Sequence, residues 1–160
     1  MDIDIVLERR FTQATRNVEQ MLLPLDNISD DGMYTILARY TAVIEPNFIT
    51  WMTAAALSAR SQDVCYTGWA NLEVEFQDDH QGMLRAFARA ARAYPDTVHH
   101  EYMDGPLQDI RGMVKQWNGV QNTTLVAYLE NTSVAFIPYL AKIAKRRGST
   151  DLRYTDIHGT

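Results

Sequence analysis

Three ionisable side chains occupy helical positions at which an apolar residue would be expected. On a wheel of about 100° per residue with Trp69 at 0°, Glu73 lies at about 40° and His80 at about 20°, inside the apolar arc. The same construction from Val126 places Glu130 at about 40° on a later helix. Because a buried carboxylate without a partner is costly, these groups must be paired, protonated or bound to a metal.

Two interpretations account for these predicted buried charges. In the first, Glu73 or Glu130 forms a structural polar network with Arg39 or a tyrosine, and each position taken alone favours this interpretation. In the second, carboxylates and imidazoles from facing helices hold two iron or manganese ions. Such a site needs more ligands, and two further candidates are Glu45 at a helix joint and His158 in the terminal YTDIHG.

The elements that must position these residues are predicted to be helices. Apolar residues recur at intervals of three and four, and the sustained alternation typical of strands is missing, so the fold class is all-α. The longer expected helices cover residues 3–23, 33–44, 64–94 and 123–147. The segment after Pro46 is either a separate helix or a kinked extension, and a shorter helix ends near Trp117. His99 and His100 are expected in a solvated connection, and Pro138 is expected to kink the last long helix.

The composition excludes several classes of protein. With 160 residues, 46% of them hydrophobic, we expect one helical domain over 1–160. A net charge of −5 with mostly scattered basic residues argues against nucleic-acid binding. No stretch reaches the ~18 apolar residues of a membrane span, and the N-terminus is unlike a signal peptide, so we expect a cytoplasmic protein without a membrane partner. The single cysteine, Cys65, excludes an internal disulfide.

In their order and spacing, the candidate residues resemble a family: the heme-oxygenase-like di-iron oxidases and oxygenases, whose helical bundle is shared with the thiaminase-like proteins. The resemblance covers the chain from about Tyr40 to the end. Its motifs are Glu73 and His80 in NLEVEFQDDH, Glu130 in YLENTS and His158 in DLRYTDIHG. In the family, the first glutamate and histidine share one core helix, the next core helix brings a glutamate, and a third brings His-x-x-x-Asp-x-x-His.

The resemblance implies a heme-oxygenase-like bundle that binds two Fe(II) ions and uses O2 as co-substrate. The metal ligands that it implies are Glu73, His80, Glu130 and His158, with Glu45 as an additional upstream carboxylate. The sequence differs from the family pattern after His158, because it stops two residues later and the expected aspartate and last histidine are absent. We therefore expect the last core helix to be truncated or incompletely represented.

The implied function is an O2-activating oxidase or oxygenase of a biosynthetic pathway, acting as a homodimer on a small amine, amino acid or fatty-acid-like substrate. The aromatic residues expected to line its substrate pocket are Tyr154, Trp69, Tyr128, Trp51 and Phe48. Two other classes stay open. A thiaminase-like hydrolase would share the fold and use Cys65 as its nucleophile, whereas a metal-free helical interaction protein would tolerate an apolar residue in place of Glu130.

Overall fold

The computed structural model describes residues 3–59 and 62–157, and within these ranges every regular element is a helix. The elements are α1 (Ile3–Met21), η1 (Leu25–Asn27), α2 (Asp30–Ser58), α3 (Gln62–Gln77), α4 (His80–Ala90), α5 (Thr97–Gln116), α6 (Gly119–Arg146) and α7 (Arg153–Asp156). The prediction of an all-α fold is confirmed. Over the same ranges, none of these helices has the length and apolar character needed to cross a bilayer.

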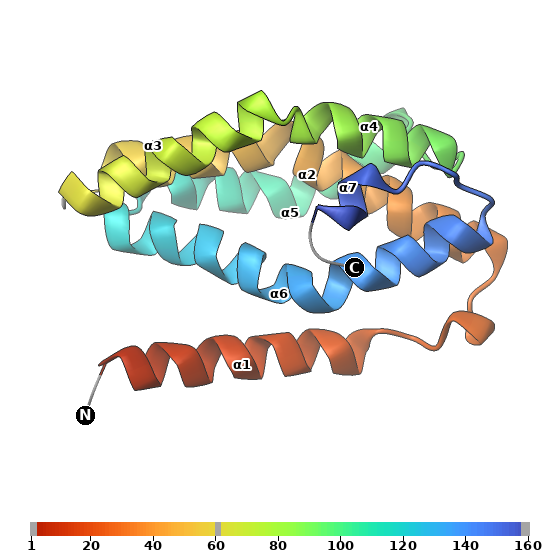
Figure 1. The fold of residues 1–160 in the computed structure, drawn as a ribbon, viewed down its shortest axis with the longest axis horizontal. Coiled ribbons are helices and arrows are strands. Elements are labelled where there is room, and N and C mark those ends of the chain that lie inside the picture. The colour runs from red at the N-terminus through yellow and green to blue at the C-terminus, as the bar shows by residue number, and fades with distance from the viewer. Residues whose placement is uncertain (1–2, 60–61, 158–160) are drawn as a thin grey trace.

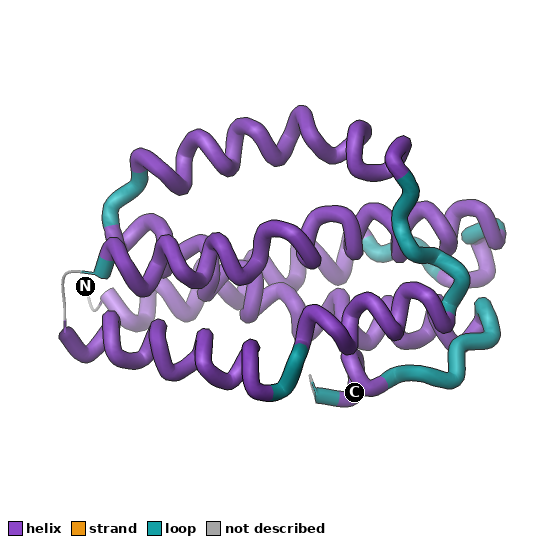
Figure 2. The backbone as a smooth tube through the Cα atoms, turned by 90° about the horizontal axis from the view of Figure 1, so that it is seen from above, coloured by secondary structure: helices purple, strands orange, loops and turns teal. Residues whose placement is uncertain are grey.

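Helix α2 lies at the centre of the bundle. It packs against α3, α4, α5 and α6, while α1 packs along the outer side of α6 (Figure 1). The short α7 lies against α4 and α6, so the end of the described chain returns to the middle of the bundle. Figure 2 shows that the long helices run lengthwise and that the loops gather mainly at the two ends.

Polar caps decide where several helices begin. Ser29 accepts a hydrogen bond from the backbone N–H of Gly32, so α2 begins three residues before the predicted start. The helix then continues through Pro46 to Ser58 as one element rather than as two. Helix α6 likewise begins at Gly119, earlier than predicted, because Asn118 forms a capping box with the residue three positions later.

The predicted continuous helix over 64–94 is wrong, because the chain turns at Asp78 and Asp79. Asp79 has a left-handed backbone, with φ of 48°, and its carboxylate accepts a hydrogen bond from the N–H of Gly82 at 3.1 Å. An aspartate tolerates this conformation better than most residues, and the same side chain caps the next helix. The segment therefore forms two helices, α3 and α4, and one helical wheel cannot describe the inward-facing residues of both.

The prediction that His99 and His100 lie in a loop is also wrong, because both belong to the first turn of α5. Asp96 caps this helix by accepting a hydrogen bond from the N–H of His99 at 3.0 Å. The His99 ring packs edge-on against Tyr34, with ring centroids 5.1 Å apart. His99 therefore helps to dock α5 on α2, whereas His100 is exposed.

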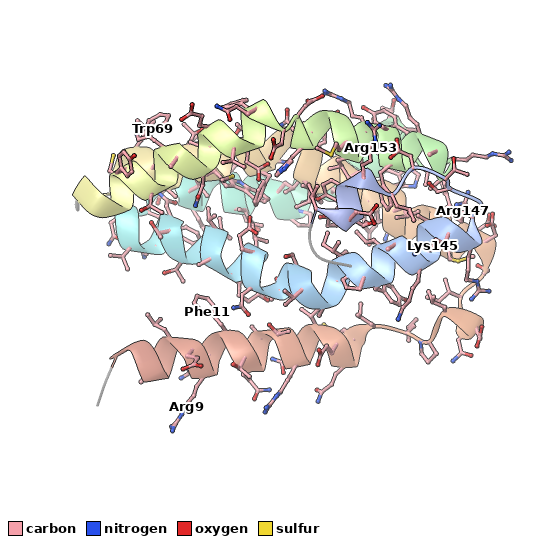
Figure 3. All side chains as sticks on the ribbon, in the orientation of Figure 1. Arg9, Phe11, Trp69, Lys145, Arg147 and Arg153 are labelled. Atoms are coloured by element: carbon pink, nitrogen blue, oxygen red, sulfur yellow. The ribbon has the colours of Figure 1, made fainter. Side chains whose placement is uncertain are left out.

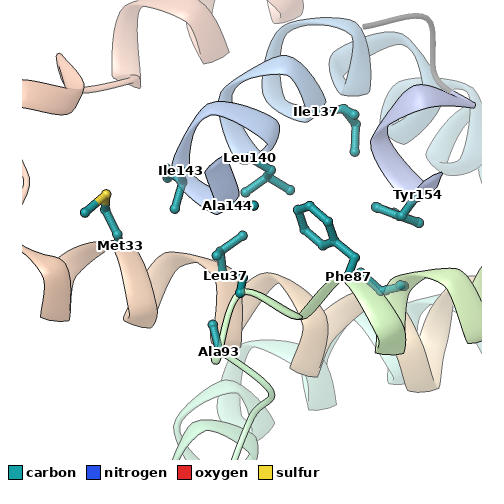
Figure 4. Packing of buried hydrophobic residues seen from close by; sticks show 11 residues of the cluster. Met33, Leu37, Phe87, Ala93, Ile137, Leu140, Ile143, Ala144 and Tyr154 are labelled. Atoms are coloured by element: carbon teal, nitrogen blue, oxygen red, sulfur yellow. The ribbon is translucent and has the colours of Figure 1, made fainter. Parts of the chain in front are cut away.

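The main hydrophobic cluster joins α2, α4, α6 and α7. Leu37, Phe87 and Leu140 are fully buried at its centre, and Tyr154 of α7 closes one side (Figure 4). Burying one such side chain contributes about 1.5–3 kcal/mol. The cluster therefore anchors the half of the bundle that carries α4 and α7.

We predict opposite effects of alanine at two glycines. At Gly119, a Cβ would overlap the carbonyl oxygen of Ser58, so Gly119→Ala forces the end of α2 away from α6. It should lower the free energy of unfolding by roughly 1–3 kcal/mol. At Gly112 of α5 no atom lies within 4 Å of an added Cβ, and Gly112→Ala should raise that free energy by about 0.5–1 kcal/mol. Urea denaturation measures both, and equal effects would contradict the close approach.

Candidate functional site

A cavity of about 760 Å³ lies along α2, and α1 to α7 all contribute to its wall. On α2 the lining runs from Ile36 to Ile49, a length of about 20 Å at about 1.5 Å per residue. Most of the lining side chains are aliphatic or aromatic. The volume lies within the roughly 300–1,000 Å³ that is usual for small-molecule sites.

Four ionisable side chains of the metal-binding type line this cavity. They are Glu45 of α2, Glu75 of α3, His80 of α4 and Glu130 of α6. The first three side chains are only 15%, 13% and 15% exposed. The bundle thus directs three carboxylates and an imidazole from four different helices to one largely apolar space.

Glu75 and His80 form the closest pair in the site, with 2.8 Å between Oε1 of Glu75 and Nδ1 of His80. Five residues along an unbroken helix would point the two side chains about 140° apart. They meet because the turn at Asp78 and Asp79 redirects the chain between them. A carboxylate on one ring nitrogen fixes the orientation of the imidazole.

Glu130 is an exposed residue, so the prediction that it is buried in the core is wrong, but its carboxyl group is partly shielded from solvent at the cavity wall. Burial raises its pKa above the ordinary value, and the negative charge of Glu75 raises it further, while His80 acts in the opposite direction. Among the described residues, the Glu130 carboxylate has no hydrogen-bond or ion-pair partner. A cation in the cavity would relieve the repulsion between the two carboxylates.

Glu45 is already compensated by neighbouring side chains. Its Oε1 lies 3.4 Å from a guanidinium nitrogen of Arg85, and Tyr94 donates a hydrogen bond to its Oε2 at 3.1 Å. Burial, followed by the charge of Glu45, raises the pKa of Tyr94. Glu45 is therefore less available to a ligand than Glu130.

Two tyrosines pair beside these acids. The hydroxyl groups of Tyr40 and Tyr154 lie 2.6 Å apart, and Tyr154 is 5% exposed. Burial raises the pKa of both phenols well above the ordinary value, and the charges of Glu130 and Glu75 act in the same direction. Both phenols are thus neutral near pH 7 and can donate hydrogen bonds.

The wheel predicted the wrong inner face for α3. Glu73 is exposed and accepts a hydrogen bond from Gln77 at 2.9 Å, and Trp69 is 45% exposed and projects outward (Figure 3). The helix packs on α2 through Leu72 and Gly68, where an added Cβ would lie 3.0 Å from the Cβ of Ala56. A close approach of two helices requires small residues, so the largest aromatic side chain does not mark the core.

Glu75 is the site residue that the wheel missed. It follows Leu72 by three positions and therefore shares the face that Leu72 and Gly68 turn towards α2. A wheel oriented on these two residues, rather than on Trp69, would have found it. The structure places Glu75, not Glu73, in the cavity with His80 and Glu130.

The remaining predicted residues have different locations. Tyr128, Tyr154 and Phe48 line the cavity. Trp51 is 3% exposed but packs with residues of α5 in another cluster. His158 lies outside the described residues. Cys65 of α3 is partly buried and does not belong to the cavity wall that the structure describes.

The donor types at the cavity fit a metal ion. Carboxylate oxygen and imidazole nitrogen are common ligands of Fe(II) and Mn(II). Within residues 3–59 and 62–157, however, no group of three His, Cys, Asp or Glu side chains is arranged so that it could hold one ion. Metal binding would therefore require Glu75, His80 and Glu130 to move closer together.

A double-mutant cycle tests the tyrosine pair. Tyr154→Phe and Tyr40→Phe should each lower the free energy of unfolding by about 1 kcal/mol, because each leaves the other hydroxyl without this partner. The double variant should lose less than the sum of the two single variants, because the hydrogen bond between the two hydroxyl groups can be lost only once. Urea denaturation gives the three values, and simple additivity would contradict a direct hydrogen bond.

Comparisons with known proteins identify no family for this chain. No protein-family model matches it, and neither a curated protein nor a solved structure shows significant similarity. The residues that line the cavity are therefore the guide to the function of this protein.

Proposed function

We propose that this protein is a non-heme di-iron oxidase or oxygenase built on a heme-oxygenase-like bundle. The proposal rests on one observation. Three carboxylates and an imidazole line one largely apolar cavity, and they belong to Glu45, Glu75, His80 and Glu130. Ionisable groups are costly in such surroundings and are usually retained there for binding or chemistry. A small-molecule substrate, a homodimeric state and a cytoplasmic location remain parts of the proposal.

The contacts of Glu130 favour a ligand site over a structural polar network. A structural network would pair its members, yet the Glu130 carboxylate has no hydrogen-bond or ion-pair partner among the described residues. Arg39, the partner expected for a network, instead stacks on Tyr102, with 3.5 Å from its guanidinium carbon to the ring centre. The pairing that would make Glu130 structural is therefore missing.

We assign roles to the residues as follows. Glu75 takes the place of Glu73 in the proposed ligand set, together with His80 and Glu130, while Glu45 and His158 are additional ligands. When bound, two Fe(II) ions supply electrons for the reduction of O2.

The residues around the proposed ligands have supporting roles. Glu75 orients the imidazole of His80. The paired phenols of Tyr40 and Tyr154 hold protons at the edge of the site, and the apolar wall limits access of water.

The alternative functions receive less support from the geometry. A thiaminase-like hydrolase needs its nucleophile at the substrate cavity, and the described wall does not include Cys65. A metal-free interaction protein gives no reason for Glu75, His80 and Glu130 to line a common cavity. Metal binding separates both alternatives from the proposal.

Anaerobic Fe(II) binding tests the proposal. The key comparison is between Glu75, which lines the cavity, and Glu73, which lies on the same helix but is exposed. The purified protein is incubated with Fe(II), freed of unbound metal and assayed for iron, and we expect about two ions per chain. Glu75→Gln and Glu130→Gln should weaken binding by more than the roughly 10–100-fold cost of losing an outer-shell partner. Glu73→Gln is the matched control and should bind iron normally, because Glu73 is exposed.

Two results would overturn the proposal. One is the absence of iron uptake by the unmodified protein, which would favour a metal-free function. The other is an equal loss of Fe(II) binding in Glu73→Gln and Glu75→Gln, which would show that the iron does not bind in the cavity. Oxygen consumption by the iron-loaded protein, lost in Glu130→Gln, is the second readout.

A further inference from the structure

Arg39 is the only arginine or lysine among the described residues that line the cavity. Its guanidinium carbon lies 3.5 Å from the centre of the Tyr102 ring, while its Nε is buried without a hydrogen-bond partner. In the described part of the chain it also forms no ion pair. One face of this cation is thus covered by an aromatic ring, and its buried Nε–H, which lies in the plane of the guanidinium, has no acceptor among the described residues.

An unused donor of this kind needs an explanation. Leaving a buried donor unsatisfied costs about 1–3 kcal/mol, and native proteins keep few such groups. Stacking on Tyr102 accounts for the position of Arg39 but satisfies none of its N–H groups. A ligand in the cavity would supply the missing acceptor.

We propose that Arg39 binds the carboxylate of an amphiphilic substrate whose apolar body lies in the cavity. A guanidinium presents two parallel N–H donors that match the two oxygens of a carboxylate. A phosphate carries more charge and would call for further basic groups, which the described wall does not provide beyond the imidazole of His80. A substrate amine at this position would be repelled.

The charged groups of the cavity favour one orientation of the bound molecule. Tyr102 is 59% exposed, so the Arg39 end is open to solvent, whereas the side chains of Glu75 and His80 are 13% and 15% exposed. Between Arg39 and Ile49 the α2 wall covers about 15 Å and includes mostly apolar residues. The carboxylates of Glu75 and Glu130 would repel a ligand carboxylate from their own part of the cavity. A ligand that binds Arg39 therefore keeps its carboxylate away from Glu75 and Glu130, and its apolar tail lies along the aliphatic and aromatic wall.

This assignment deepens the proposed function, because it uses the same cavity and selects carboxylates with an uncharged tail among the possible substrates. Only the statement that the bound carboxylate is a substrate of the oxidase rests on the proposed function. Binding of the carboxylate itself requires no metal. The two proposals can therefore fail separately.

The test is a binding measurement on the protein freed of metal with a chelator. Isothermal titration compares dodecanoate with dodecanol, which has the same chain but no charge, and octanoate and hexadecanoate vary the chain length. We expect dodecanoate to bind more tightly than dodecanol. Arg39→Gln should weaken dodecanoate binding by roughly 10–100-fold and leave dodecanol binding unchanged, because only the charged hydrogen bonds are lost.

Two further variants control the experiment. Arg89→Gln removes an arginine that also stacks on a tyrosine, 4.8 Å from the ring centre of Tyr94, but that is not part of the described cavity wall. It should bind dodecanoate normally. Arg39→Lys keeps the charge and loses the paired donors, so its affinity should be intermediate. It also provides the measurement if Arg39→Gln does not fold.

Three results would overturn the assignment. In the first, the unmodified protein binds dodecanoate and dodecanol with equal affinity. In the second, the Arg39 variants bind dodecanoate as tightly as the unmodified protein does. In the third, none of the three acids binds. Carboxylate binding that depends on Arg39 without iron uptake would leave this assignment standing and remove only the oxidase. Iron uptake without carboxylate binding would leave the proposed oxidase standing and remove the carboxylate site at Arg39.

Discussion

Burial of α2 on several sides is the constraint on which the rest of the structure depends. Its buried residues recur on successive turns from Met33 to Ala56, so neighbouring helices must enclose it. Helices α3, α4, α5 and α6 do so, and α1 then covers α6. Pro46 interrupts the backbone hydrogen bonds of α2 in this protected position, where Gln81 of α4 donates a hydrogen bond to the carbonyl of Glu45 at 2.8 Å. Enclosure of one long helix thereby also creates the cavity along it.

The cavity combines an apolar wall with two polar groups that lack a partner among the described residues, the carboxylate of Glu130 and the Nε of Arg39. Burial and the negative charge of Glu75 raise the pKa of the Glu130 carboxyl group, and the Nε of Arg39 is buried without a hydrogen-bond partner. Neither arrangement is favourable for stability alone, because buried charges and donors are best paired within the protein. A cation among the acids and an anion at Arg39 would compensate groups of opposite charge in one cavity. This complementarity links the two proposals.

A single turn connects the fold to the candidate site. Asp78 and Asp79 end α3 and start α4, which lets Glu75 and His80 approach although they are close in sequence and would diverge on one helix. The left-handed backbone of Asp79 and its cap to Gly82 stabilise the new direction. The backbone conformation of two exposed residues, Asp78 and Asp79, thus determines which glutamate contacts His80.

The sequence by itself determined the all-α class, the approximate extent of most helices and the positions of Glu45, His80 and Glu130 beside apolar helix faces. These features follow from local periodicity, which depends on residues three and four positions apart. Only the tertiary structure decided that Glu75, rather than Glu73, lines the cavity. The choice depends on how closely α3 approaches α2 at Gly68, and a wheel contains no information on the neighbouring helix. The free donor of Arg39 was equally invisible, because it results from the absence of a partner across several helices.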